Sequence, residues 1–357
     1  MPDTLPDKVT VLVMMDGTEW PLDDITAIAP ERLEVHQVPP QAFEDDAGMH
    51  PPSTGLWKPR PWHTDLTKPD LEELLRTASV LTMAVPFPKR LYPRMPNLTW
   101  VHYAFAGISD MRASDLWGQP VRVTSSRGYV DVLPIAETVI GATLLFAKNL
   151  NVAVKQTTAG RLDRAEYGMK FLAGKTMGII GLGGIGEHTA RLAKALGMRV
   201  VATRRSVTER RTDMPNVDLL YPPAELDLLL AESDFLTLAP MLTDETRGMM
   251  NARTFGQMKQ GACILNVARG EVIDEAALKD ALRSGKLGGA YLDVYTDEWS
   301  RLPDPELMAL PTVVITPHNS GITDVGTSYA MDLFRDNLRR LLGEEPLVNE
   351  VEWARGY

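Results

Sequence analysis

The sequence predicts an α/β fold made of two doubly wound parallel-sheet domains. Apolar, strand-like runs alternate along the chain with helix-forming stretches, which is typical of sheets built from strand–helix–strand units. This alternation occurs in two successive series. A chain of 357 residues with 44% hydrophobic residues is also long enough to bury two cores of ordinary size.

The first series lies before residue 127. Its strand-like runs are VTVLVMM, ASVLTMAV, LTWVHYA and PVRVTSS. Between the first two runs lies a stretch rich in proline and acidic residues, 38–63, which we interpret as a long surface excursion. His50 and His63 in this stretch lack a partner at metal-ligand spacing, so the sequence favours surface histidines over a metal site.

The second series is clearer and contains six strand-like runs: TMGIIG, RVVAT, DFLTLA, ACILNV, AYLDV and TVVITPH. Between the first two, EHTARLAKALG places Ala190, Ala193 and Leu196 near one face of a helix that should end at Gly197. After the last run one more helix pattern follows, GTSYAMDLFRDNLRRLLG. No strand pattern is left for this helix to serve, so we expect it to pack on the first domain.

Composition limits the classes of partner. The formal net charge of −10 argues against a nucleic-acid surface. The single cysteine, Cys263, excludes a disulfide framework or a CxxC metal site and is expected in the core. The N-terminus lacks the pattern of a signal peptide, and the apolar helix Val139–Ala147 is too short to span a bilayer. We therefore expect a cytoplasmic protein with no metal, membrane or nucleic-acid partner.

A glycine motif marks the nucleotide site. GLGGIG places Gly181, Gly183 and Gly186 at the first, third and sixth positions, with Gly184 and Ile185 between them. Such glycines permit a tight turn, close approach of the backbone to a pyrophosphate, and close helix packing, while the following helix N-terminus attracts the anion. Because a strand precedes the motif and a helix and second strand follow it, we interpret it as a dinucleotide site rather than a structural turn.

The choice of cofactor depends on the end of that second strand. Arg204 stands 23 residues beyond Gly181, where a carboxylate would favour the ribose hydroxyls of NAD. A guanidinium instead offers a planar fork to phosphate oxygens, and Arg205 and Ser206 add a second charge and a hydroxyl. The sequence therefore favours NADP over NAD. The alternative is that the two arginines form only a solvated loop.

Three later segments, NVARGEVIDEAAL, AYLDVYTDE and VVITPHNSG, follow GLGGIG in an order that resembles the D-isomer-specific 2-hydroxyacid dehydrogenases, including glyoxylate/hydroxypyruvate reductases. The resemblance covers nearly the whole chain. It implies a Rossmann dinucleotide-binding domain, 128–319, inserted into a flavodoxin-like substrate-binding domain, 1–127 and 320–357, with a cleft between them. It makes Arg269, Glu298 and His318 the catalytic residues, and we expect Ala239, Pro240 and Ala268 to contact the cofactor.

These three residue types suit the reduction of a 2-oxo acid to a D-2-hydroxy acid. His318 can supply the proton near neutral pH, and Glu298 would orient the ring and favour its charged form. Arg269 can grip the substrate carboxylate and polarise the carbonyl that accepts hydride. Each residue alone has an ordinary structural explanation, and only their combination in the family order supports catalysis.

The resemblance also implies that backbone amides of Ala106 and Gly107 face the substrate carboxylate, with Phe105 as a candidate pocket wall. The local sequence AGISD departs from the family pattern, in which an apolar residue is often followed directly by aspartate. Helix Val139–Ala147 is expected to help form a homodimer.

One alternative function of a different class remains open at this point. A nucleotide-sensing corepressor or scaffold could use the same fold, because fold alone does not establish catalysis. Formate oxidation is disfavoured, because formate dehydrogenases, which are relatives, have glutamine where this chain has Glu298. Glyoxylate, hydroxypyruvate and bulkier 2-oxo acids all remain candidate substrates.

Overall fold

The computed structural model describes residues 5–15, 20–43, 49–50, 66–128, 132–298, 301–322, 324 and 328–353. These residues divide into two compact units. Unit 1 takes the described residues within Met1–Asp131, Trp299–Arg301 and Thr323–Tyr357, and unit 2 takes Val132–Glu298 and Leu302–Ile322. Most of the proline-rich stretch, including His63, lies outside the described residues.

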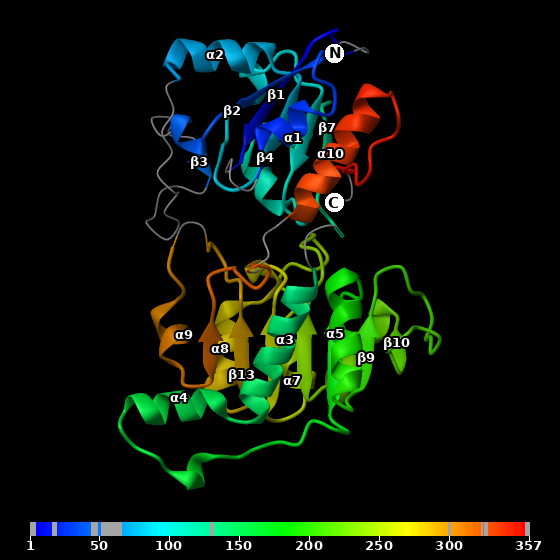
Figure 1. Cartoon of the computed structure of the whole chain (residues 1–357). Coiled ribbons are helices and arrows are strands. Elements are labelled where there is room, and N and C mark those ends of the chain that lie inside the picture. The colour runs from blue at the N-terminus through cyan, green and yellow to red at the C-terminus, as the bar shows by residue number, and fades with distance from the viewer. Residues whose placement is uncertain are drawn as a thin grey trace. The chain divides into compact units, whose positions relative to one another are not determined.

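Unit 1 contains a five-stranded parallel sheet with the order β2-β1-β4-β6-β7 (Figure 1). Its strands are β1 (Val9–Met14), β2 (Leu33–Gln37), β4 (Val80–Met83), β6 (Trp100–Tyr103) and β7 (Arg122–Ser125). Numbered within the sheet, this order is 2-1-3-4-5, the flavodoxin-like order. A separate antiparallel pair joins β3 (Met49–His50) and β5 (Phe87–Pro88).

The sequence-based series omitted β2, and this omission was wrong. Its residues LEVHQ pair with β1 at the sheet edge, and only Leu33 in the strand is buried. An edge strand that buries one face gives a weak apolar signal, and the proline-rich stretch begins directly after it.

Helices cover both faces of this sheet. The first face packs on α1 (Leu22–Thr26) and α10 (Ser328–Leu342), and the second packs on α2 (Lys68–Thr77). Phe334 of α10 lies in the same core cluster as Val9 of β1 and Trp100 of β6, so the C-terminal helix packs on the first domain as predicted. Short 3₁₀ helices, η1 (Pro40–Phe43), η2 (Tyr92–Arg94) and η3 (Ser109–Ala113), complete unit 1.

Unit 2 contains a seven-stranded parallel sheet with the order β10-β9-β8-β11-β12-β13-β14. The strands are β8 (Thr176–Ile180), β9 (Arg199–Thr203), β10 (Leu219–Tyr221), β11 (Phe235–Leu238), β12 (Ala262–Asn266), β13 (Leu287–Leu292) and β14 (Val313–Ile315). The first six have the Rossmann order 3-2-1-4-5-6. Strand β10 was not predicted, because three residues followed by Pro222 make too short an apolar run to detect.

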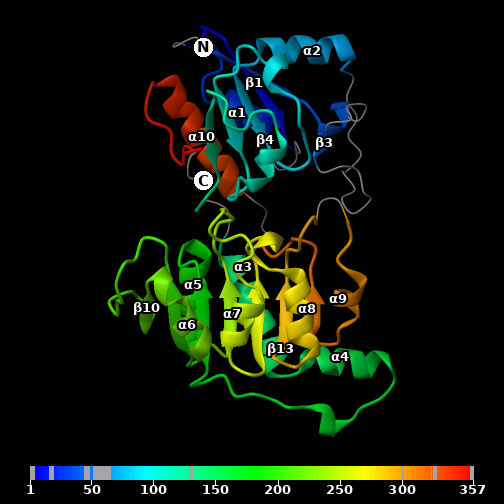
Figure 2. The same cartoon turned by 180° about the vertical axis from the view of Figure 1, so that it is seen from behind.

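The sheet of unit 2 is covered on both faces (Figures 1 and 2). One face packs on α3 (Val132–Ala147) and α5 (Gly184–Ala195), and the other on α6 (Leu226–Glu232), α7 (Ala252–Gln257) and α8 (Glu275–Arg283). The remaining helices are α4 (Leu150–Thr158), α9 (Pro305–Ala309), η4 (Arg164–Glu166), η5 (Pro223–Glu225) and η6 (Gly270–Val272).

Two core predictions are confirmed in unit 2. Cys263 is buried in the sheet, and burial raises the pKa of its thiol to about 11, so it is an inert core residue. Helix α5 ends before Gly197, which has φ +75°, a left-handed conformation that glycine adopts readily.

None of the helices in the described part of the chain is by itself both long and apolar enough to cross a membrane. Taken together, α3 and α4 reach that length and composition, with a 69° bend between them.

Candidate active site

The glycine turn lies at the carboxyl end of β8, where the strand order reverses between β9 and β11. Gly181 has φ +95°, and its backbone touches the Ala239–Pro240 peptide: a Cβ at Gly181 would lie 2.6 Å from the Ala239 carbonyl oxygen. Both Gly181 and Leu182 donate backbone hydrogen bonds to the Thr203 carbonyl oxygen, at 3.1 Å. The turn after β8 is therefore held against the ends of both neighbouring strands.

The geometry of this turn fits a dinucleotide pyrophosphate. Gly183 precedes the first turn of α5 and has open space where a side chain would be, so a ligand can approach the backbone there. At Gly186, in contrast, a Cβ would lie 2.6 Å from the Gly181 carbonyl oxygen, so the third glycine permits close packing of helix on turn. Gly184 and Ile185 form the start of the helix between them.

Arg204, Arg205 and Ser206 directly follow β9, at the same edge of the sheet. Both arginine side chains are exposed and face carboxylates: Arg204 Nη1 lies 3.9 Å from Glu187 Oε1, and Arg205 Nη2 lies 3.3 Å from Glu245 Oε1. Exposed ion pairs of this kind contribute at most about 1 kcal/mol, so an incoming phosphate can displace them.

Arg269 follows β12 and is fixed by its backbone. The Asn266 side chain accepts a hydrogen bond from Ala268 N–H and donates one to the Arg269 carbonyl oxygen, at 3.0 and 2.9 Å. Gly270 lies against the Tyr295–Thr296 peptide so closely that a Cβ would come within 2.0 Å of the Tyr295 carbonyl carbon. The loops after β12 and β13, which carry Arg269 and Glu298, are thus in direct backbone contact.

Glu298 and His318 form a pair. His318 Nδ1 lies 2.9 Å from Glu298 Oε1. A carboxylate only accepts hydrogen bonds, so this contact places a hydrogen on Nδ1 and leaves proton transfer to Nε2. The Glu298 side chain is only 8% exposed, and within the described residues its Oε2 has no hydrogen-bond partner. The buried carboxylate is therefore directed at the ring.

Asp293, which the sequence analysis did not single out, holds the His318 loop. Its buried carboxylate accepts hydrogen bonds from the Thr316 hydroxyl, the Asn319 N–H, and the N–H and hydroxyl of Ser320. The His318 N–H also donates to the Asp293 carbonyl oxygen, at 2.8 Å. These bonds keep His318 at φ +51°, a conformation that costs a non-glycine residue energy. The only sequence signal was an acid directly after a buried strand.

The residues named for the substrate loop lie in unit 1, after β6. Phe105 is partly buried and packs edge-on against Tyr103, with ring centroids 5.7 Å apart, as a core residue does. Ala106 and Gly107 follow it, both partly buried. In the segment AGISD, Ile108 is buried in the core and Ser109 begins η3.

His102 in β6 of unit 1 is a core residue and not part of the candidate site. Its ring is fully buried among Trp20, Trp100 and Phe334. Its nitrogens lie 2.9 Å from Thr124 Oγ1 and 3.1 Å from Ser126 Oγ. Burial lowers the pKa of His102 to about 3, so the ring is neutral and structural.

Six loops at the carboxyl ends of the unit 2 strands thus carry the predicted residues. Arg269, Glu298 and His318 follow the adjacent strands β12, β13 and β14, while the glycine turn, Arg204 and Ala239 follow β8, β9 and β11. This is the edge at which parallel α/β sheets bind ligands. Within the described residues, no group of three or more His, Cys, Asp or Glu side chains could hold a metal ion.

Comparisons with known proteins match this architecture. The family model described as D-isomer specific 2-hydroxyacid dehydrogenase, NAD binding domain, matches residues 140–320. A hydroxypyruvate reductase from Thermotoga maritima is 32% identical over 260 residues, which are 71% of this chain and 81% of that protein. A D-3-phosphoglycerate dehydrogenase from Methanocaldococcus jannaschii is 29% identical over 290 residues, 81% of this chain. The match covers only 54% of that longer protein.

Solved structures extend the similarity to the whole chain. A D-isomer specific 2-hydroxyacid dehydrogenase from Xanthobacter autotrophicus, in complex with NADPH and MES, has a TM-score of 0.74 and 27% identity. The alignment covers 99% of this chain and 100% of that one.

Proposed function

Because the chain belongs to the D-isomer specific 2-hydroxyacid dehydrogenases, we propose that it catalyses the NADP(H)-dependent reduction of a 2-oxo acid to a D-2-hydroxy acid. The observation that carries the proposal is the Glu298–His318 pair, held at one edge of the sheet that also bears the glycine turn. A buried carboxylate aimed at an imidazole is the arrangement a proton donor needs.

His318 is the acid in the reductive direction. Glu298 holds Nδ1, so Nε2 delivers the proton to the carbonyl oxygen as the alcohol forms, and accepts it back in the reverse reaction. Asp293 fixes the loop on which the ring stands. Arg269 binds the anionic substrate through its guanidinium and stabilises negative charge that develops on the carbonyl oxygen.

When bound, the nicotinamide supplies the hydride that adds to the carbonyl carbon. Gly181, Gly183 and the N-terminus of α5 would hold the pyrophosphate, beside Ala239 and Pro240. Ala268 precedes the substrate arginine and would lie near the nicotinamide. The preference for NADP rests on Arg204, Arg205 and Ser206 in the place of an acidic ribose ligand.

The substrate proposal is a small 2-oxo acid, with glyoxylate and hydroxypyruvate first among the candidates. The named relatives support this class: one is a hydroxypyruvate reductase. We assign the substrate carboxylate to Arg269 of unit 2; contact of the substrate with the Ala106–Gly107 backbone and with Phe105 of unit 1 remains a prediction from the family resemblance.

The test is an absorbance assay of NADPH oxidation with purified protein across glyoxylate, hydroxypyruvate, pyruvate and bulkier 2-oxo acids, with NADH in parallel. Turnover with at least one acid, faster with NADPH, is the expected result. Tight binding of NADPH without turnover of any acid would favour the nucleotide-sensing corepressor or scaffold instead.

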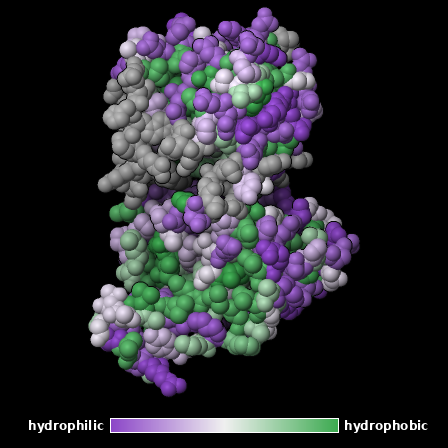
Figure 3. Space-filling model, in the orientation of Figure 1, coloured by the Kyte–Doolittle hydropathy of each residue, from purple (hydrophilic) through white to green (hydrophobic). Residues whose placement is uncertain are grey.

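We also propose that two copies of the chain associate. The helix Val139–Ala147 directs Val139, Ala142 and Phe146 into the core of unit 2. Exposed apolar side chains instead follow it: Leu150, Val154, Leu162, Met169 and Phe171, which are 49–84% exposed. Figure 3 shows apolar residues gathered on the face of unit 2 where α3 and α4 lie. Exposed apolar side chains that gather on one face are typical of an interaction surface.

Sedimentation velocity tests the dimer. The protein should sediment as a dimer, and Val154→Asp with Phe171→Asp should shift it toward a monomer. Leu228→Asp on α6 is the matched control, since Leu228 is also exposed but lies outside this segment. A monomeric wild type would rule out the association.

A further inference from the structure

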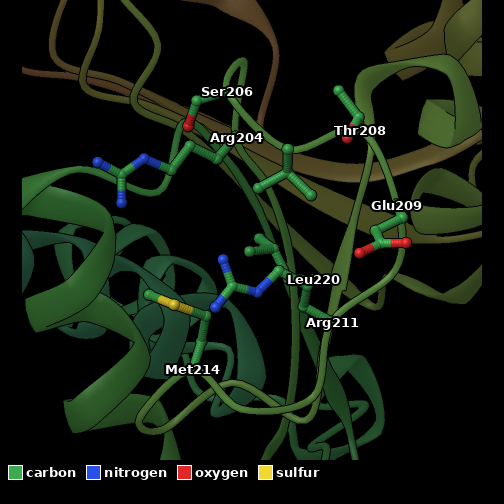
Figure 4. A pocket seen from close by; sticks show the side chains of 8 residues that line it. Arg204, Ser206, Thr208, Glu209, Arg211, Met214 and Leu220 are labelled. Carbon is green, nitrogen blue, oxygen red and sulfur yellow. The ribbon is translucent and has the colours of Figure 1, made fainter.

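A pocket of about 160 Å³ lies beside Arg204 in unit 2 (Figure 4). It is lined by Arg204, Ser206, Val207, Thr208, Glu209, Arg211, Met214 and Leu220. Arg204 and Ser206 are residues to which we assign the 2′-phosphate of NADP. Arg211, which has no role so far, brings a second guanidinium to the same hollow.

The backbone of Arg211 is fixed to the sheet. Arg211 N–H donates to the Leu220 carbonyl oxygen at 3.0 Å, and Leu220 N–H donates to the Arg211 carbonyl oxygen at 2.8 Å, so the two residues form an antiparallel bridge. Leu220 in turn pairs with Ala202 of β9, two residues before Arg204. With neighbouring strands about 4.8 Å apart, the Arg211 backbone lies roughly 10 Å from β9, a gap that an arginine side chain can largely cross.

The pairing of Arg211 with Leu220 and of Leu220 with Ala202 also determines on which face of the sheet each side chain lies. Residues paired across strands project to the same face, so Arg211 shares a face with Leu220 and Ala202, both members of the core cluster that includes α5. The neighbouring residue, Arg210, projects to the opposite face. There its Nε donates a hydrogen bond to Glu225 Oε2 at 2.6 Å, and its guanidinium carbon lies 5.4 Å from the centroid of the Tyr221 ring.

The charges in the pocket suit an anion. Two guanidinium groups and the hydroxyls of Ser206 and Thr208 line it, against one carboxylate, that of Glu209. Arg211 itself is bound by Asp213, with Nε–Oδ1 2.9 Å and Nη2–Oδ2 2.6 Å. Both side chains of the Arg211–Asp213 ion pair are exposed, so the pair is weak. A dianionic phosphate can therefore compete with Asp213 for the guanidinium.

We propose that Arg211 is a second ligand of the cofactor's 2′-phosphate and a determinant of NADP specificity, reaching it from the segment beyond β10 while Arg204 reaches it from the end of β9. This proposal rests on the proposed preference for NADP. It places the discrimination between the two cofactors on two separate segments, so that Arg204 alone does not account for it.

The test compares two small probes that differ only in the 2′-phosphate, adenosine 2′,5′-bisphosphate and 5′-AMP. Their dissociation constants are measured by calorimetry for wild type, Arg204→Gln, Arg211→Gln and Arg210→Gln. The dissociation constant of AMP divided by that of the bisphosphate isolates the contribution of the 2′-phosphate, and a larger ratio means stronger discrimination. Arg210→Gln is the matched control, because it removes the same charge from the neighbouring residue on the opposite face.

Wild type should bind the bisphosphate more tightly than AMP. Arg211→Gln should reduce that ratio about tenfold, as expected for loss of one charge-assisted contact, while Arg210→Gln should keep it near the wild-type value. AMP should bind all four proteins with similar affinity. Arg211→Met serves as a second neutral variant, and thermal unfolding of each variant shows whether it is folded.

Different results would overturn the proposed NADP preference and the proposed role of Arg211. If wild type binds both probes equally, the NADP preference is wrong and the role of Arg211 falls with it. If wild type discriminates and Arg204→Gln loses discrimination, but both neutral Arg211 variants keep the wild-type ratio, only the role of Arg211 is overturned. An equal loss in Arg210→Gln and Arg211→Gln would also overturn it, because it would reflect net charge alone.

Discussion

His318 Nδ1 lies 2.9 Å from Glu298 Oε1, so in the proposed mechanism Nε2 is the nitrogen that exchanges a proton with substrate. We therefore predict that His318→Ala lowers turnover by about two to four orders of magnitude, the usual contribution of a positioned acid. NADPH affinity, measured by fluorescence titration, should barely change.

His36→Ala is the control for that variant, because His36 is a partly exposed histidine of unit 1 whose Nε2 lies 3.0 Å from Glu34 Oε1, outside the candidate site. It should keep wild-type turnover. Near-native turnover in His318→Ala would show that another group supplies the proton.

Arg269 is expected to act through the bidentate hydrogen bonding of its planar guanidinium as well as through its charge. Both Arg269→Lys and Arg269→Ala should lower kcat/KM by at least about a hundredfold, with little rescue by lysine, because an ammonium cannot make the bidentate contact. Steady-state kinetics with the best 2-oxo acid measure this. Full activity in the lysine variant would mean that only the charge matters.

Replacing Arg204 with Asp should move specificity toward NADH. The change removes a charge-assisted contact and places an anion near the 2′-phosphate, so NADPH should bind roughly ten- to hundred-fold more weakly. NADPH and NADH are titrated against both proteins at several salt concentrations, since salt should reduce the wild-type preference. A wild type that prefers NADH would contradict the cofactor assignment.

The Thr316 hydroxyl donates to Asp293 and lies 2.7 Å from the Tyr291 hydroxyl. A carboxylate cannot donate, so the Tyr291 hydroxyl must donate to Thr316. Thr316→Val removes the donor to a buried carboxylate, and should lower the free energy of unfolding by about 1–3 kcal/mol and reduce turnover. Urea unfolding and steady-state kinetics measure the two effects, and a variant unchanged in both would show that the loop is held without this bond.

Buried His102 should make the protein less stable in acid. Its pKa is about 3 when folded and near 6.5 when unfolded, so between these pH values the unfolded chain binds more protons. The stabilising contribution is complete above pH 6.5 and is lost as pH falls toward 3, by up to about 1.4 kcal/mol for each pH unit. The free energy of unfolding of His102→Gln, measured between pH 7 and 4, should fall less steeply than that of wild type. Parallel slopes would contradict the burial argument.

The sequence predicted the parts of the fold that have a local signal. Long apolar runs such as those of β1 and β8 and the glycine turn could be recognised, because burial on both faces and a required backbone conformation constrain the residues directly. The edge strands β2 and β10 could not, since one pairs at a sheet edge with mostly unburied residues and the other has three residues.

In the candidate site, too, some residues could be predicted from the sequence and others could not. Glu298 and His318 were predicted as partners from the resemblance to the family, and their side chains meet in the structure. The structural roles of Asp293 in the site and of His102 in the core of unit 1 were not predicted, because they depend on which distant residues pack around them. Nothing near His102 in the sequence indicates that Phe334 covers its ring.

The packing of α10 on the first sheet has a consequence for biosynthesis. Val9, Trp20 and Trp100 bury their side chains against Met331 and Phe334, which leave the ribosome more than 200 residues later. Until then the nascent chain exposes this apolar face, while the residues of unit 2 have already been made. Unit 2 can therefore fold during translation, whereas the core on this face of unit 1 is complete only after α10 has been made.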